Sequence, residues 1–241
     1  MHTETVEAVV ISLSDYGESD LIVTVFSREQ GKFRGIARGA RKSRKRFAGA
    51  LEMFARLSLT VRPKEGLWGV DGADILSIHS GIRGDLHRIA CASYAAELTD
   101  VFLPDSLTNP RYYRLLCAYL ERLHTAPAQA AERRFFEINL LNILGYRPDL
   151  EGCGACGAPL AAGARLCGAE LRCPACGRGG FPVSTPTLSG LSACLRTGRF
   201  GMVELQEGAL AEAGRLLDAL VASHAARHLR SLPFLQEMEG S

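Results

Sequence analysis

Two closely spaced cysteine pairs constrain the fold of this chain more than any other feature. The first pair is Cys153 and Cys156 and the second is Cys173 and Cys176, with sixteen residues between the pairs. Two residues between thiolates allow one tight turn to direct both sulfurs at one metal ion, and two such turns complete a tetrahedral site. A glycine follows each pair, and we expect it to adopt a positive φ so that its amide points towards a sulfur. The spacing therefore predicts a four-cysteine zinc module in an insert at about residues 148–184.

Four thiolate ligands leave no open position for water or substrate, so the single predicted zinc ion is structural rather than catalytic. Its physical role is to fold an insert that is rich in Gly and Cys and has almost no apolar core of its own. The alternatives are disulfides, unreacted thiols, or redox C-x-x-C motifs, although the βαβ pattern of a thioredoxin-like fold is missing. Cys167 is badly spaced for the site, and we expect the remaining cysteines to be buried thiols: Cys91, Cys117 and Cys194.

No targeting or membrane-spanning segment is predicted. The first residues, Met-His-Thr-Glu-Thr, lack the charged and then apolar order of a signal peptide. No apolar run approaches the roughly 18 residues that a membrane span requires. We therefore expect a soluble cytoplasmic protein whose cysteines stay reduced and available for metal. Because 47% of the 241 residues are apolar, the chain can build a sizeable core in one or two domains.

The first 80 residues have the pattern of an all-β domain. A hairpin turn is predicted at Glu29-Gln30-Gly31, where glycine supplies a positive φ. In the fourth predicted strand, Leu57, Leu59 and Val61 alternate with polar residues, as in a half-buried strand. The predicted strands are 6–13, 21–26, 32–37, 54–61 and 68–78, the last broken at Asp71-Gly72. Five strands without intervening helices predict an N-terminal five-stranded OB-fold barrel over residues 1–80.

The pattern changes to helical spacing over residues 81–241. Helices are predicted at 86–102, after a start at Asn109-Pro110, at 128–144 with Gly145 as the stop, and at about 209–229. The predicted fold class is therefore α+β multidomain. An OB-fold barrel is followed by an α-helical C-terminal domain, into which the four-cysteine zinc module is inserted.

A concentrated run of positive charge lies near the start of the chain. Residues 28–46 contain nine Lys or Arg and one Glu, whereas the formal charge of the whole chain is only +2. We place its core at the end of the third strand and in the following loop, where long cationic side chains reach phosphates. Few aromatic residues are interleaved (Phe33, Phe47 and Phe54, with Tyr16 and Trp68 further off), which favours backbone contact over base readout. The predicted nucleic-acid contacts are Lys32, Arg34, Arg38, Arg41, Lys42, Arg44, Lys45 and Arg46.

Other interpretations of these features are weaker. The charged run is otherwise a solvated loop, or a membrane-surface patch that lacks the amphipathic apolar face such a patch needs. His224 and His228 have no evident third metal ligand, and the Gly81-x-x-Gly84 match to a KH loop fits a domain junction better. No Walker loop, G-x-S-x-G motif or cluster of acids is present. We therefore expect no enzymatic activity.

Several motifs of the chain resemble those of the bacterial RecO family of DNA repair proteins. They are Tyr16-Gly17-Glu18-Ser19-Asp20-Leu21, the segment 24–32, Ala37-Arg38-Gly39-Ala40-Arg41, and Leu144-Gly145-Tyr146-Arg147-Pro148-Asp149-Leu150 ahead of the first cysteine pair. The resemblance extends over most of the chain, from about residue 5 to residue 235. It implies an OB-fold domain, an α-helical domain and a zinc module.

The resemblance also implies a function and a set of partners. The function is that of a recombination mediator, which binds single- and double-stranded DNA, anneals complementary strands and helps to load recombinase on coated single strands. The implied partners are RecR, the single-stranded-DNA-binding protein and, functionally, RecA. The residues themselves leave two alternatives open. One is an RNA-binding OB-fold and zinc interaction module, and the other is an enzyme, either a nuclease or a thiol oxidoreductase.

Overall fold

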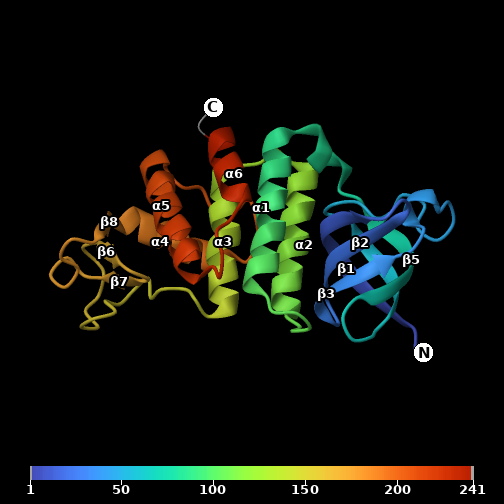
Figure 1. The fold of residues 1–241 in the computed structure, drawn as a ribbon. Coiled ribbons are helices and arrows are strands. Elements are labelled where there is room, and N and C mark those ends of the chain that lie inside the picture. Colours follow the sequence, from blue (N-terminus) through green and yellow to red (C-terminus); the bar gives the residue numbers. More distant parts are fainter. Residues whose placement is uncertain (1, 240–241) are drawn as a thin grey trace. The chain divides into compact units, whose positions relative to one another are not determined.

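The computed structural model describes residues 2–239, and the chain divides into two compact units (Figure 1). The first unit comprises Met1–Pro127 together with Leu229–Ser241, and the second is Ala128–His228. The second unit is therefore formed by one continuous segment, whereas the first unit contains segments from both ends of the chain. The predicted division at residue 80 falls within the first unit, between its barrel and its helices.

The first unit begins with a closed five-stranded barrel, which confirms the predicted OB-fold. The strand order around the barrel is β1-β2-β3-β5-β4, closed by antiparallel pairing of β1 with β4. One pairing is parallel, between β3 and β5, where Gly35 lies opposite Trp68 and Ile36 opposite Gly69. Gly31 has a φ of 69°, as the hairpin prediction required. The strands are β1 (Glu4–Tyr16), β2 (Asp20–Ser27), β3 (Gly31–Ala37), β4 (Arg56–Arg62) and β5 (Trp68–Ser77).

The predicted break in the fifth strand is wrong, because β5 continues through it as a β-bulge. Thr60 pairs with Gly72 and Val61 with Val70, so that Asp71 is the extra residue of β5. A bulge leaves one residue out of the ladder and increases the local twist without ending the strand. The Asp-Gly pair therefore redirects an acidic side chain on the outer face of the barrel.

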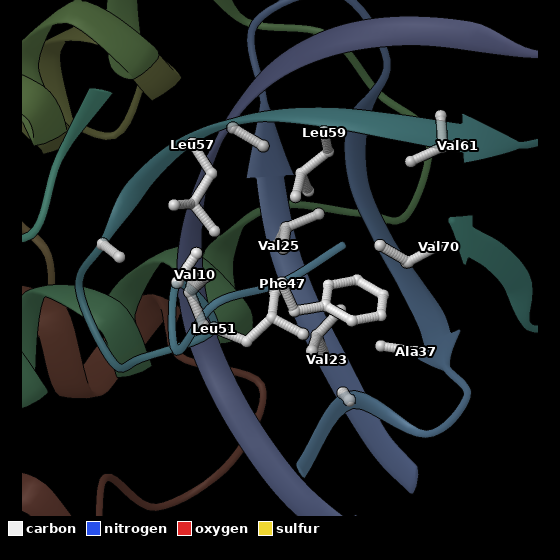
Figure 2. Packing of buried hydrophobic residues seen from close by; sticks show 14 of the residues in the cluster. Val10, Val23, Val25, Ala37, Phe47, Leu51, Leu57, Leu59, Val61 and Val70 are labelled. Carbon is white, nitrogen blue, oxygen red and sulfur yellow. The ribbon is translucent and has the colours of Figure 1, made fainter. Parts of the chain in front are cut away.

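The barrel core is completed by residues from the long β3–β4 connection. Alternate residues of the strands point inward, as expected for a sheet that is buried on one face. The side chains of Phe47 and Leu51, from this connection, also point into the cluster of buried apolar residues inside the barrel (Figure 2). Phe47 is only 1% exposed. The connection that carries the basic residues is therefore packed against the barrel and is not a freely extended loop.

Replacement of the Phe47 side chain with a smaller one is expected to destabilise the barrel and to loosen the β3–β4 connection. Replacement of Phe47 with Ala removes a fully buried aromatic ring, which typically lowers the free energy of unfolding by about 3–5 kcal/mol. Urea denaturation measures this change, and a Phe47→Leu variant is the control because it keeps most of the apolar volume. A loss below about 1 kcal/mol for the alanine variant would show that the loop does not contribute to the core.

Three helices complete the first unit: α1 (Leu86–Phe102), α2 (Pro110–Thr125) and α6 (Ser231–Glu239). The bounds of α1 and the start of α2 are confirmed, and the Asn109 side chain accepts a hydrogen bond from the Tyr112 amide at 3.0 Å. α6 was not predicted. It packs against α1, and the Glu97 carboxylate accepts hydrogen bonds from the amides of Arg230 and Ser231 at its start.

The second unit contains α3 (Ala130–Leu144), α4 (Thr185–Thr197) and α5 (Glu207–His224). α3 ends at Gly145, whose φ is 81°, as predicted, whereas α4 was missed and α5 ends five residues before the predicted bound of 229. A buried ion-pair network joins α3 to α5. Arg133 lies 2.9 Å from Glu137 and 2.8 Å from Asp218, with both Arg133 and Glu137 fully buried. No helix in the described part of the chain is long and apolar enough to cross a membrane.

Candidate nucleic-acid interface and metal centre

Seven of the eight predicted nucleic-acid contacts have exposed side chains on the barrel. Arg34 lies on β3, and the other six lie in the β3–β4 connection, within or close to a short 3-10 turn at Ala40–Lys42. Gly39, two residues after the end of β3, adopts a φ of 66° at the start of this turn, a conformation that favours glycine. The exposed residues are Arg34, Arg38, Arg41, Lys42, Arg44, Lys45 and Arg46.

The eighth predicted contact, Lys32, lies elsewhere. Its side chain is buried against the helical part of the first unit, where Nζ lies 3.1 Å from Asp100 Oδ1 and 3.4 Å from Asp105 Oδ1. Nζ also donates to the Asp100 carbonyl at 2.7 Å. A lysine that is nearly buried and paired with two carboxylates stabilises the fold and has little surface to offer a phosphate.

The basic loop, residues 38–46 of the β3–β4 connection, is held against the β1–β2 turn and the start of β2 by hydrogen bonds from its backbone amides. The Gly39 amide donates to Asp20 Oδ1 at 2.7 Å, and the Arg41 amide donates to the Ser19 carbonyl at 3.1 Å. Arg41 also forms an exposed ion pair with Asp15 at 3.2 Å. An exposed ion pair contributes little to the stability of the fold, so Arg41 remains able to exchange Asp15 for a phosphate.

Two further cations join Arg38 and Arg46 in a groove on the barrel. Arg62, at the end of β4, and Lys64, in the β4–β5 loop, line a hollow of about 320 Å³ together with them. Neither residue was predicted, because both lie sixteen or more residues beyond the basic run. Their position at and just after the end of the fourth predicted strand could have identified them as site residues. The loop between strands four and five of an OB-fold is a common ligand-binding element.

Most aromatic residues near the basic run are not available for base stacking. Phe33, Phe47 and Phe54 are all less than 8% exposed and belong to the packed interior. Trp68 is partly exposed and stacks on Phe33, with ring centroids 4.3 Å apart and planes inclined by 17°. It lines a second hollow, of about 480 Å³, with Arg34 and Lys64. Trp68 is therefore the aromatic side chain best placed beside the cations.

The four paired cysteines come together in the second unit. All four Sγ atoms lie within 4.8 Å of one another, and Cys156 Sγ lies 3.9 Å from Cys173 Sγ. Tetrahedral coordination with Zn–S bonds of about 2.3 Å places sulfurs about 3.8 Å apart, which agrees with this spacing. The donor set and its geometry therefore fit a zinc ion, although they do not identify the metal. Cys153 and Cys156 with Cys173 and Cys176 are the residues that would hold it.

The two glycines that follow the cysteine pairs serve different purposes. Gly157 has a φ of 71°, as predicted, and its amide donates to the Cys153 carbonyl at 2.8 Å. Gly177 does not have the predicted positive φ. A Cβ atom at Gly177 would lie 2.7 Å from Arg165 Cβ, so glycine is required there for space. The Gly177 amide donates to the Cys173 carbonyl at 2.9 Å, so both glycine amides bind carbonyl oxygens, and the prediction that they point towards sulfurs is wrong.

The predicted insert contains a small sheet and several buried apolar side chains, neither of which was predicted. The sheet has the order β7-β6-β8, formed by β6 (Ala164–Cys167), β7 (Glu170–Arg172) and β8 (Phe181–Val183). Its buried side chains are Leu160, Ala164, Leu166, Leu171 and Val183. Periodicity did not reveal these strands because they are only three or four residues long.

The electrostatics of the cluster favour a bound cation. Hydrogen bonds from backbone N–H groups lower the pKa of Cys153 to about 6, and the largest contribution comes from the Cys173 amide. Hydrogen bonds with Cys156 and Cys173 raise the pKa of Cys176 to about 12, and burial and the charge of these two neighbouring sulfurs act in the same direction. A divalent cation offsets these effects and allows all four thiols to ionise. Among the other cysteines, Cys91 and Cys194 are buried as predicted, whereas Cys117 is partly buried.

The structure also explains two motifs to which no function was assigned from the sequence: the His224 pair and the Gly81-x-x-Gly84 segment. His224 stacks on Tyr146, with ring centroids 4.6 Å apart. The segment Ser80–Gly84 is a 3-10 turn between the barrel and α1, and the Gly81 amide donates to His124 Nδ1 at 2.9 Å. This turn is a packed junction and does not present a KH-type loop.

Comparison with known proteins gives matches over nearly the whole chain. Residues 1–79 match the family model described as "Recombination protein O N terminal", and residues 83–233 match "Recombination protein O C terminal". A protein from Geobacter sulfurreducens named DNA repair protein RecO is 50% identical over 241 residues, covering 99% of both chains. Proteins of the same name from Pelobacter propionicus (50% identity, 99% and 98% covered) and Myxococcus xanthus (37%, 96% of each) are also similar.

Proposed function

Because this chain belongs to the RecO family of DNA repair proteins, we propose that it acts as a DNA-binding recombination mediator. It binds single- and double-stranded DNA without strong sequence preference and anneals complementary strands. It helps to load recombinase on coated single strands, with RecR, the single-stranded-DNA-binding protein and RecA as functional partners. It acts without breaking bonds, and its zinc ion is structural.

The observation that supports this proposal best is the group of exposed cations on the barrel. Arg34 and six residues of the β3–β4 connection are accessible, and the loop that carries them is packed against the barrel core. A cationic surface that is already ordered loses little conformational entropy when it binds a polyanion. Contacts with phosphates carry no sequence information, which agrees with a mediator that must act on any DNA.

Strand annealing follows from the same contacts. Two complementary strands repel each other through their phosphates, and a cationic surface that neutralises both backbones lowers this repulsion. Because the contacts are to phosphates, the edges of most bases remain available for pairing. The same surface therefore accounts for binding to single strands, to duplexes and to the transition between them.

A salt titration with single-stranded DNA tests the proposal. If about five phosphates are neutralised, the logarithm of the association constant is expected to fall with the logarithm of salt concentration with a slope near −3.5. Fluorescence anisotropy of a labelled oligonucleotide at several salt concentrations measures this slope. A slope near zero, or no binding at low salt, would contradict the assignment.

An RNA-binding interaction module is the remaining alternative, because phosphate contacts do not distinguish the two nucleic acids. Competition between DNA and RNA strands of matched sequence separates these functions, and we expect DNA to bind at least as tightly. Incubation of labelled DNA with Mg²⁺, and an assay of dithiol turnover, test for nuclease and oxidoreductase activity. We expect no product in either assay.

A further inference from the structure

The groove beside the basic loop is hollow because a glycine lies in the middle of a cross-strand row. Ile36 on β3 pairs with Gly69 on β5, and Gly69 pairs in turn with Arg62 on β4. Side chains of one row point to the same face of a sheet, here the outer face of the barrel. Since Gly69 contributes no side chain, the hollow of about 320 Å³ opens between Ile36 and Arg62.

A flat guanidinium group forms part of this hollow. Arg62 Nε lies 2.6 Å from Asp71 Oδ2, and Arg62 Nη2 donates to Asp71 Oδ1 at 2.7 Å. This two-point contact fixes the plane of the guanidinium. A Cβ atom at Gly69 would lie 3.4 Å from both Nε and Nη2, so the group lies against the backbone of β5. Its side chain is nevertheless 45% exposed.

Apolar and cationic side chains surround the guanidinium. Ile36 and Pro63 provide the apolar part of the lining, and Arg38, Arg46 and Lys64 provide positive charge. The position of Arg46 is fixed, because its Nη2 donates to the Arg38 carbonyl at 2.7 Å and its guanidinium lies 5.2 Å from the Phe47 ring centroid. A small apolar hollow with convergent charged groups is typical of a ligand site.

We propose that this hollow binds one unpaired nucleobase of a single DNA strand, stacked on the Arg62 guanidinium. Arginine planes stack on bases, and such stacking tolerates any base because every base has a π-face. Arg38, Arg46 and Lys64 then contact the phosphates on either side of the bound base. The inference rests on the proposed DNA-binding function and adds to it a site that takes a base as well as phosphates.

Such a site distinguishes single strands from duplexes. A base in a duplex is stacked and paired, and its removal from the stack is energetically unfavourable. An unpaired base does not incur this cost. Duplex DNA therefore binds through phosphate contacts alone, whereas single-stranded DNA gains an additional contact at the hollow. The exposed cations supply general affinity, and the hollow supplies the preference for single strands.

A matched pair of glycine variants tests the inference. A Gly69→Leu variant adds a side chain where the Arg62 guanidinium lies against β5, so it displaces the stacking group and occupies part of the hollow. A Gly72→Leu variant adds the same side chain to the same strand at a position that does not line the hollow. A Cβ atom meets nothing closer than 3.4 Å at either position, and neither residue has a positive φ. We expect Gly69→Leu to weaken binding to single-stranded DNA about tenfold and to leave duplex binding within about twofold of wild type. Gly72→Leu is expected to change neither.

An Arg62→Lys variant provides a second test, because it keeps the positive charge and removes the planar guanidinium group. It is expected to reduce the quenching of a 2-aminopurine base in a bound oligothymidylate, with the salt slope unchanged. Circular dichroism and thermal unfolding establish that each variant is folded. Equal single-strand affinity and equal quenching for wild type and both groove variants would overturn the inference, while tight binding by all three would leave the proposed function intact. Absence of binding by the wild type would instead contradict the proposed function.

Discussion

Replacement of Cys156 or Cys176 with serine is expected to remove the metal and unfold the insert. Structural zinc contributes about 10–16 kcal/mol of apparent binding free energy in small zinc domains, which is far more than three short strands and a few buried leucines supply. Metal analysis is expected to give about one zinc ion per chain for the wild type and almost none for either variant. Limited proteolysis is then expected to cut the variants between residues 150 and 183.

Cys167 provides the matched control for this experiment. It lies at the end of β6 in the same small sheet, and it is not one of the four clustered cysteines. A Cys167→Ser variant is expected to keep its zinc and its resistance to protease. If the wild-type protein contained no metal and its insert still resisted proteolysis, the zinc assignment would be wrong.

Reversal of three charges in the basic loop is expected to abolish most DNA binding. A variant with Arg38, Arg44 and Lys45 replaced by glutamate loses about three phosphate contacts and places three negative charges on the surface. The salt slope for single-stranded DNA is expected to fall from about −3.5 to about −1.4, and affinity at moderate salt to fall on the order of 100-fold or more. The anisotropy titration used for the wild type measures both quantities.

The control for this variant must carry the same change in net charge. Arg111 and Arg114 on α2, together with Arg230, have exposed side chains in the first unit outside the barrel. Their joint replacement by glutamate changes the total charge equally and is expected to weaken binding less than tenfold. If the two triple variants lost the same affinity, general charge and not the basic loop would account for binding.

Sequence patterns predicted the parts of this fold that have strong local signals. The bounds of α1, the Asn109 cap and the Gly145 stop follow from helical spacing and from the residues that end helices. The four cysteines were found because their spacing reflects metal geometry. In contrast, the strands of the insert are only three or four residues long, and α4 packs against α3, which is distant in sequence.

The candidate site was predicted only where its residues are consecutive. The basic loop is visible as a run of charge, but Arg62 joins Arg38 only because β3 and β4 both pair with β5. The burial of Lys32 also depends on tertiary structure, since its partners Asp100 and Asp105 lie more than sixty residues further along the chain. Composition gives the charge of a segment, whereas strand order determines which charges face the solvent together.

The return of α6 to the first unit has a consequence for the order of synthesis. The helix packs against α1, and its first amides are bound by the Glu97 carboxylate. A ribosome therefore completes the whole second unit before the segment that finishes the first one emerges. During translation the α6-facing surface of α1 therefore remains exposed until the second unit has been synthesised, and exposed apolar surface of this kind favours aggregation.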